Sequence, residues 1–254
     1  MKLSVATMAR NEEKIVPYFI HHYSDIVDEI IFVDNESTDN TEKIVKDLCS
    51  KFGIKLVYYK LQTGGFNESL KLQVYTSVQK NIFNTNSDWY ILVDCDEFIY
   101  DKSNRLKDKL KDYYDSGYSF LKPNGYQMSE LEFPEYKGIK ITETCKMGCR
   151  DDVFDKPVIV HKDLKWIPSL GCHIANGFID NHPVLPKVDE DILLLHYKLL
   201  GKQYRLDRIK QFANNLDDLG KQMLDNGINV QLKSSEESLS QDFDEKYSKR
   251  IKVI

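Results

Sequence analysis

The sequence predicts an α/β protein with a mostly parallel central sheet and helices on both faces of that sheet. Over the first hundred residues, short apolar runs alternate with segments of helical periodicity, which is the order of a parallel sheet whose strands are connected by helices. The runs are almost continuously apolar, as expected for strands buried on both sides. With 254 residues, 41% of them hydrophobic, the chain is long enough to bury a large core.

Four apolar runs mark the expected strands of this sheet. They are residues 3–8 (LSVATM), 29–34 (EIIFVD), 54–59 (IKLVYY) and 89–93 (WYILV). A first helix is expected after Asn11, with Pro17 in its first turns, where proline is tolerated. A second places Ile44 and Leu48 four positions apart on one face, and a third covers residues 67–83.

Beyond residue 117 the pattern is looser, and turn residues between aromatic segments indicate strands and loops that cover one end of the sheet. Residues 191–197 (DILLLHY) predict one more buried strand, and residues 204–224 predict one amphipathic helix. The expected organisation is a single domain over residues 1–230, with parts at 1–100 and 101–200, a C-terminal helical extension at 201–230 and a polar tail at 231–254.

Composition excludes several classes of protein. The formal net charge of −5 disfavours long contacts with nucleic acid. The sequence has no run of 18 apolar residues that would predict a membrane span, and the N-terminus becomes charged before a signal segment could form, so we expect a cytoplasmic protein.

The five cysteines fit reduced thiols better than disulfides. A zinc cluster is the alternative for some of them, but the gap between the first two candidates is unusual for zinc. The residues concerned are Cys145, Cys149, Cys172 and His173.

Polar clusters follow the strands at the edge where parallel sheets bind ligands. They are Ala9–Glu12, Asp34–Asn35 and Asp94–Glu97. Buried carboxylates at such positions need cations or hydrogen-bond donors, because unpaired burial costs several kcal/mol. Asp94 and Asp96 lie two apart, so an extended chain points both in one direction. Two such oxygen ligands form a partial site for Mg²⁺ or Mn²⁺, which the phosphates of a substrate complete.

These clusters resemble those of a known family. Asp-x-Asp-Glu-Phe at 94–98 follows an apolar strand, Asn11-Glu12 follows the first strand, and Asp-Asn-x-Ser-x-Asp at 34–39 follows the second. Together they resemble the family 2 type glycosyltransferases, and more narrowly the branch with a D-x-D-E-F metal motif and a C-terminal His-Tyr. The resemblance implies the GT-A fold, with a nucleotide-sugar half at 1–100 and an acceptor half at 101–200.

The resemblance also implies an activity and its partners. Such enzymes move a sugar from a nucleoside diphosphate-sugar, here most simply a UDP-sugar, to a glycan or glycolipid acceptor with the help of Mn²⁺ or Mg²⁺. Two alternatives stay open at this point. One is a sugar-phosphate nucleotidyltransferase, which expects a glycine-rich loop after the first strand. The other is a GT-A-like binding module without activity.

Carried over by position, the resemblance implies a role for each site residue. The expected nucleotide-sugar-binding residues are Ala9, Asn11, Glu12, Asp34, Gln73 and Asp94, and the expected metal ligands are Asp94, Asp96 and His196, with Glu97 as support. Each has a structural alternative: Asp34 can simply begin a turn, and His196 can be a buried core residue beside its leucine neighbours. The expectation is that positions 34, 94, 96 and 196 converge on one ion and its diphosphate.

An inverting transfer also needs a base that takes the proton of the acceptor hydroxyl. The resemblance implies a base well downstream of the metal motif, on the acceptor side, and Asp152 is our choice for it. The competitors are Asp151, Glu130, Glu132 and His173, and both the base and the stereochemical outcome stay open.

Basic residues at the start of the last predicted helix bear on location. They indicate peripheral contact with anionic lipid at the inner face of a membrane, and the alternative is an ordinary core-packing helix with a solvated face. These residues are Lys202, Arg205, Arg208 and Lys210.

Overall fold

The structure is a computed structural model that describes residues 1–227 and 230–254. Its elements in chain order are β1 (Leu3–Ala9), α1 (Val16–Ser24), β2 (Glu29–Asn35), α2 (Thr41–Phe52), β3 (Lys55–Leu61), α3 (Glu68–Gln79), β4 (Trp89–Leu92), β5 (Glu97–Asp101), α4 (Leu106–Asp115), β6 (Phe120–Leu121), β7 (Asn124–Glu130), α5 (Ile141–Thr144), β8 (Met147–Arg150), η1 (Asp152–Phe154), β9 (Ile159–His161), β10 (Lys165–Pro168), η2 (Leu170–Cys172), β11 (Ala175–Ile179), β12 (His182–Val184), β13 (Ile192–Leu200), α6 (Lys202–Asn214), α7 (Asp218–Asp225), η3 (Val230–Lys233), α8 (Glu236–Ser248) and β14 (Ile251–Lys252).

The central sheet has the strand order β3-β2-β1-β4-β9-β6. Its first four strands are parallel, and β9 and β6 add an antiparallel edge. β1, β2 and β4 are buried along their whole length, whereas the edge strand β3 is partly exposed. The predicted fold class is therefore confirmed, and the four predicted strands begin and end within two residues of the observed ones.

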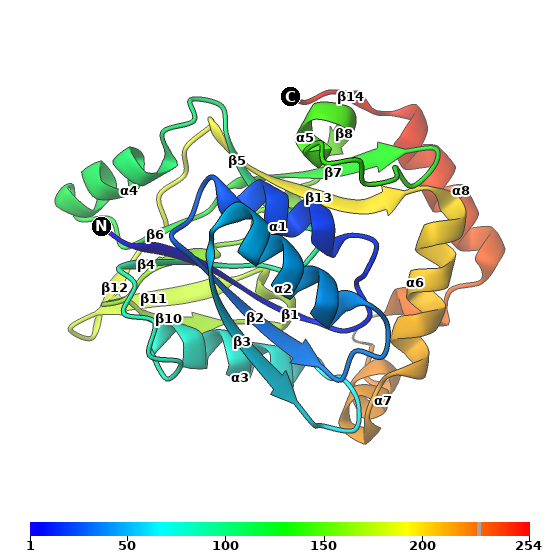
Figure 1. Cartoon of the computed structure of the whole chain (residues 1–254), viewed down its shortest axis with the longest axis horizontal. Helices are drawn as coiled ribbons and strands as arrows, with labels where there is room; N and C mark the ends of the chain where they lie inside the picture. The colour runs from blue at the N-terminus through cyan, green and yellow to red at the C-terminus, as the bar shows by residue number, and fades with distance from the viewer. Residues whose placement is uncertain (228–229) are drawn as a thin grey trace.

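Helices cover both faces of this sheet. Figure 1 shows α1 and α2 side by side on one face, with α3 on the other. The strand order explains this arrangement, because right-handed crossovers put a helix on one face when the chain steps from β1 to β3 and on the opposite face when it returns to β4. α1 buries Phe19, Ile20 and Tyr23, and α3 buries Val74 and Val78.

A second sheet, with the order β14-β8-β7-β13-β5, carries the later part of the chain. β13 confirms the strand predicted at 191–197 and extends it to Leu200. It is antiparallel to β5 and parallel to β7, with a register shift between His196 and Leu199. Because β5 begins immediately after residues 94–96, β13 lies beside the loop that follows β4.

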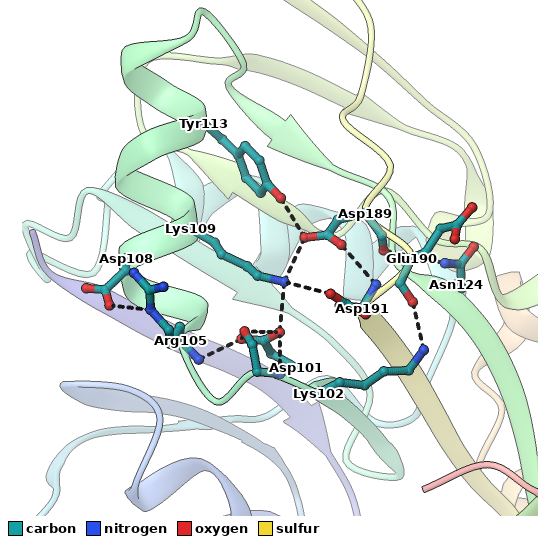
Figure 2. A network of polar contacts seen from close by, with 11 residues as sticks. Asp101, Lys102, Arg105, Asp108, Lys109, Tyr113, Asn124, Asp189, Glu190 and Asp191 are labelled. Atoms are coloured by element: carbon teal, nitrogen blue, oxygen red, sulfur yellow. Dashed lines mark hydrogen bonds and ion pairs between the residues drawn. The ribbon is translucent and has the colours of Figure 1, made fainter.

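Lys109 joins α4 to the segment before β13 (Figure 2). Its ammonium group lies 3.1 Å from a carboxylate oxygen of Asp101 and 2.9 Å from one of Asp189. Asp189 also accepts a hydrogen bond of 2.5 Å from the Tyr113 hydroxyl. One lysine thus neutralises two carboxylates at the end of β5 and in the approach to β13.

The prediction of one helix over residues 204–224 is wrong, because the chain forms two helices there, α6 and α7. The break occurs where the backbone pairs with another loop: Asn215 O accepts from Phe66 N at 2.8 Å, and Asp217 N donates to Phe66 O at 3.2 Å. The Asp217 carboxylate then caps α7 by accepting from Gly220 N at 2.7 Å. A backbone engaged in these bonds cannot continue the helical ladder.

The described part of residues 231–254, expected as a polar tail, folds back on the protein. α8 buries Leu239 and Phe243, and lies beside α6 in Figure 1. β14 pairs with β8. The four basic residues that suggested lipid contact all pair with carboxylates of the chain itself. The pairs are Lys202–Asp244, Arg205–Asp242, Arg208–Glu12 and Lys210–Glu236.

Two further expectations can be compared with the described residues. Cys145 and Cys172 are buried and Cys149 is partly buried, and no three histidine, cysteine or acidic side chains in this part of the chain gather as a metal site would require. No helix in the described ranges has the length and apolar character to cross a membrane.

Candidate active site

A cavity of about 470 Å³ lies at the carboxyl edge of the central sheet, where open parallel sheets bind ligands. Its volume is in the range of sites for small molecules. β1 contributes Met8 and Ala9, the loop after β4 contributes residues 94–97, and β13 contributes His196 and Lys198. Side chains of α3 and α6 also line it, as do residues within 153–156, 170–173 and 231–232, so segments from the whole chain meet here.

The Asp94–Glu97 loop is a turn rather than the extended segment that we expected. Glu97 N donates to Asp94 O at 2.9 Å, and the Glu97 carboxylate accepts from Asp94 N at 3.1 Å. The expected extended conformation of residues 94–96 is therefore wrong, and the alternation of an extended chain does not set the directions of Asp94 and Asp96. Both residues nevertheless line the cavity.

Asp94 is held by basic and hydroxyl side chains. Its carboxylate lies 3.0 Å from Lys71 Nζ and accepts a 3.1 Å hydrogen bond from the Tyr75 hydroxyl. Lys156 Nζ is 4.0 Å from Asp94 and 2.5 Å from Glu97. Burial raises the pKa of Asp94, but Lys71 and Lys156 outweigh it and hold the pKa below its usual value. Asp94 is therefore ionised and compensated by lysines.

Asp96 instead faces His196. His196 Nε2 lies 3.4 Å from an Asp96 carboxylate oxygen, and His196 Nδ1 is buried with no hydrogen-bond partner in the described part of the protein. Burial raises the pKa of Asp96, but His196, Arg208 and Lys198 together outweigh burial and hold the pKa below its usual value. This carboxylate and imidazole fit two ligands of one cation, whereas Asp94 already receives Lys71 and Tyr75. The three predicted metal ligands thus divide into a pair and a separate, lysine-bound aspartate.

The profile of glycosyl transferase family 2 matches residues 4–136 of the chain. The chain belongs to this family. The parallel β3-β2-β1-β4 order with helices on both faces is accordingly the GT-A fold, as the resemblance implied.

Curated relatives of this family 2 chain include an uncharacterised glycosyltransferase of Rickettsia typhi. It is 31% identical over 110 residues, which cover 43% of this chain and 32% of that protein. A second, from Rickettsia prowazekii, is 29% identical over 110 residues, again 43% of this chain and 32% of the relative. The matched segment thus spans about a third of the length of these relatives.

Solved structures of two bacterial proteins are similar to it. S. aureus TarS in complex with UDP gives a TM-score of 0.43 at 18% identity, covering 64% of this chain and 47% of that chain. Glucosyl-3-phosphoglycerate synthase from Mycobacterium tuberculosis, in complex with Mn²⁺, UDP and glucosyl-3-phosphoglycerate, gives 0.31 at 20% identity, covering 50% of this chain and 44% of that chain.

The residues that the family resemblance assigned to the nucleotide-sugar lie in different places. Ala9 and Glu12 line the main cavity. Asn11 lines an adjoining cavity of about 200 Å³, together with Glu12. Gln73 is exposed on α3 and lines neither cavity. Two other residues of this helix, Lys71 and Tyr75, contact the Asp94 carboxylate.

Asp34 ends β2 in register with Ala9 of β1, so it lies at the same edge of the sheet. It is fully buried, however, and does not line the cavity. Its carboxylate accepts from Ser37 N at 2.7 Å and from the Tyr58 hydroxyl at 2.5 Å. The geometry is that of the alternative interpretation, in which Asp34 begins the turn. Positions 94, 96 and 196 line one cavity, and position 34 supports the turn that follows β2.

Of the five candidates for the base, His173 is the one that lines the cavity. Asp152, our choice from the sequence, is exposed. The other three carboxylates, Asp151, Glu130 and Glu132, also lie outside the cavity lining. His173 Nδ1 is 2.6 Å from Val153 O, and burial lowers the pKa of His173.

Sequence reasoning missed three lysines of this family 2 site: Lys71, Lys156 and Lys198. A signal for Lys71 existed, because Glu68, Lys71 and Tyr75 are spaced three and four apart and so share one face of α3. Lys198 is two positions after His196, which places both on one side of a strand. Lys156 has no local signal, since it reaches Asp94 and Glu97 from a loop distant in sequence.

Proposed function

We propose that this chain transfers a sugar from a nucleoside diphosphate-sugar, with a UDP-sugar as the first candidate, to a glycan or glycolipid acceptor. The observation that carries the proposal is the pairing of Asp96 with His196 inside the cavity, next to the lysines that hold Asp94 and Glu97. A donor of this class presents negative phosphates to such a site. Its leaving group, the nucleoside diphosphate, gains charge as the glycosidic bond breaks.

The lysines around Asp94 suit this leaving group. Burial lowers the pKa of Lys71, but Asp94 and Glu68 raise it well above the ordinary value. Burial likewise lowers the pKa of Lys156, and Glu97 and Asp94 raise it above the ordinary value. Both ammonium groups therefore stay charged at neutral pH, and both are buried, where charges interact more strongly than in water.

A divalent cation, Mn²⁺ or Mg²⁺, would be held by Asp96 and His196 together with phosphate oxygens of the donor. When bound, such an ion neutralises charge that develops on the departing diphosphate. The neighbouring Asp94 would act through Lys71, by fixing where that ammonium group lies.

The base that fits the cavity is His173 rather than Asp152. Nδ1 carries the proton that is donated to Val153 O, so Nε2 is left as the acceptor. Because burial lowers the pKa of His173, the ring is neutral at pH 7 and ready to take a proton. The acceptor oxygen would form its bond to the anomeric carbon as the bond to the diphosphate breaks, and the hydroxyl proton would pass to His173 Nε2. This single displacement inverts the anomeric centre.

The test is incubation of the purified chain with a panel of nucleotide-sugars, with and without Mn²⁺, and analysis of the released products. A glycosyltransferase slowly releases nucleoside diphosphate and free sugar even without its acceptor. In a parallel incubation with nucleoside triphosphates and sugar 1-phosphates, release of pyrophosphate would instead identify a nucleotidyltransferase. Failure to bind or turn over any donor would leave a binding module.

The Asp96→Asn variant tests the site within the same experiment. We expect release of the diphosphate to fall to background while the variant stays folded. Asp108→Asn is the matched control, since Asp108 is exposed and pairs only with Arg105 in the described structure. Wild-type turnover by Asp96→Asn would overturn the assignment of the cation to this carboxylate.

A further inference from the structure

Six cationic side chains among the described residues line the main cavity, and five of them have an acidic partner. Each of these five cations lies within ion-pair distance of a carboxylate of the protein. The pairs are Arg10–Glu36, Lys71–Asp94, Lys156–Glu97, Arg205–Asp242 and Arg208–Glu12. Lys198 is the sixth, and no carboxylate in the described part of the chain forms an ion pair with it.

The strand geometry directs Lys198 into the cavity. His196 and Lys198 both line it, whereas Tyr197 between them is buried on the other side, where its hydroxyl donates to Cys145 O at 3.1 Å. The register shift of β13 falls on these residues, between His196 and Leu199. A shift of this kind re-aims a side chain next to a functional site. Lys198 therefore lies on the same wall as the Asp96–His196 pair.

The charges around Lys198 do not compensate it. Asp96 attracts it from beyond ion-pair distance, while Arg205 and Lys156 repel it. A partly buried ammonium group without a partner costs free energy that an apolar side chain in the same place would not. An anion that enters the cavity removes this cost. A diphosphate does so best, because each of its phosphates offers several acceptor oxygens.

We propose that Lys198 binds the diphosphate of the donor and stabilises it as the leaving group. This inference rests on the proposed function and adds a residue to it. The step is the one already described: the bond from the anomeric carbon to the diphosphate oxygen breaks, the electron pair stays on that oxygen, and Lys198 offsets its charge without giving up a proton.

The experiment is calorimetric titration of wild-type protein, Lys198→Gln and Lys198→Arg, in the presence of Mg²⁺, with UDP, inorganic pyrophosphate and uridine as probes. We expect Lys198→Gln to bind UDP and pyrophosphate about tenfold to a hundredfold more weakly, as for loss of one hydrogen bond to a charged group. Uridine, which has no phosphate, should bind the wild type and this variant equally. Lys198→Arg should recover much of the affinity for pyrophosphate.

Lys111→Gln is the matched control, because Lys111 is exposed on α4, away from the cavity. Thermal unfolding should show that Lys198→Gln is as stable as the wild type, since it removes an uncompensated charge. Equal binding of pyrophosphate by the wild type and Lys198→Gln would overturn the role of Lys198 and leave the proposed function standing. If the wild type binds neither UDP nor pyrophosphate, both proposals fall.

Discussion

Glu12 and Arg208, which lie 196 positions apart in the chain, form a partly buried ion pair at the edge of the cavity. Glu12 follows β1, and Arg208 belongs to α6, so the pair ties the helical extension to the central sheet. Burial raises the pKa of Glu12 to about 8, although Arg208 lowers it. Arg208 therefore offsets the effect of burial on the Glu12 carboxyl only in part, and the pKa stays above its usual value.

We expect Arg208→Met to lower the free energy of unfolding by about 3 kcal/mol, because it leaves Glu12 buried without its partner. The double variant Glu12→Gln/Arg208→Met should be more stable than Arg208→Met alone. Urea unfolding monitored by circular dichroism measures both. Lys202→Met is the control on the same helix: Lys202 and Asp244 are 42% and 61% exposed, so its loss should cost less than about 1 kcal/mol. Equal losses in Arg208→Met and Lys202→Met would contradict the argument.

Lys109 offers a second stability test, away from the cavity. Its partners Asp101 and Asp189 are 3% and 13% exposed (Figure 2). Lys109→Met leaves both carboxylates without their shared cation, and we expect the free energy of unfolding to fall by about 2 kcal/mol. Lys111→Met, on the exposed side of α4, should change it by less than about 0.5 kcal/mol. If the two variants unfold at the same urea concentration, the lysine does not hold these segments together.

His22 predicts a loss of stability in mild acid. Burial lowers its pKa from 6.5 to about 4, although the hydrogen bond to Ile99 O, 2.8 Å long, raises it. Between these two values the unfolded chain binds a proton that the folded chain does not. Neutral His22 therefore contributes about 3 kcal/mol to the free energy of unfolding. This contribution is complete above pH 6.5 and is lost as the pH falls toward 4. Urea unfolding of the wild type and His22→Gln at several pH values measures the difference between their free energies of unfolding. This difference should narrow steadily below pH 6.5.

The two leading candidates for the base make opposite predictions. If His173 Nε2 takes the proton, His173→Ala should lower the rate of transfer about a hundredfold or more, while binding of UDP changes little. Asp152→Asn should keep the wild-type rate, because Asp152 is exposed and outside the cavity lining. Product formation with a saturating donor decides between them. A slow Asp152→Asn together with an active His173→Ala would return the role to the aspartate.

Much of the fold could be predicted because local signals were strong. Each parallel strand is a short apolar run closed by polar residues, so β1, β2, β3 and β4 were found almost to the residue. The break between α6 and α7 could not be found in this way. It depends on hydrogen bonds between Phe66 and residues 215–217, and no local pattern encodes a partner about 150 positions away.

The candidate site also combines residues with local sequence signals and residues whose placement depends on long-range contacts. Asp96 and His196 were singled out because both follow apolar runs and the family resemblance implies a role for each, and the structure brings them together. Asp34 and Gln73 also carried sequence signals, but the cavity lining includes neither. Their placement depends on contacts such as the Tyr58 hydroxyl on Asp34, which only the folded chain supplies. Lys156 shows the converse, since its role is set entirely by where its loop packs.

The backbone bridge between Phe66 and the α6–α7 junction has a consequence for the motion of the cavity wall. Phe66, Phe212 and Asn215 all line the cavity, and the rings of the two phenylalanines are 4.7 Å apart. Because the loop and the junction share two main-chain hydrogen bonds, neither can swing outward alone. The amide hydrogens of Phe66 and Asp217 should thus exchange with solvent deuterium at one common rate, because both become exposed in the same opening motion.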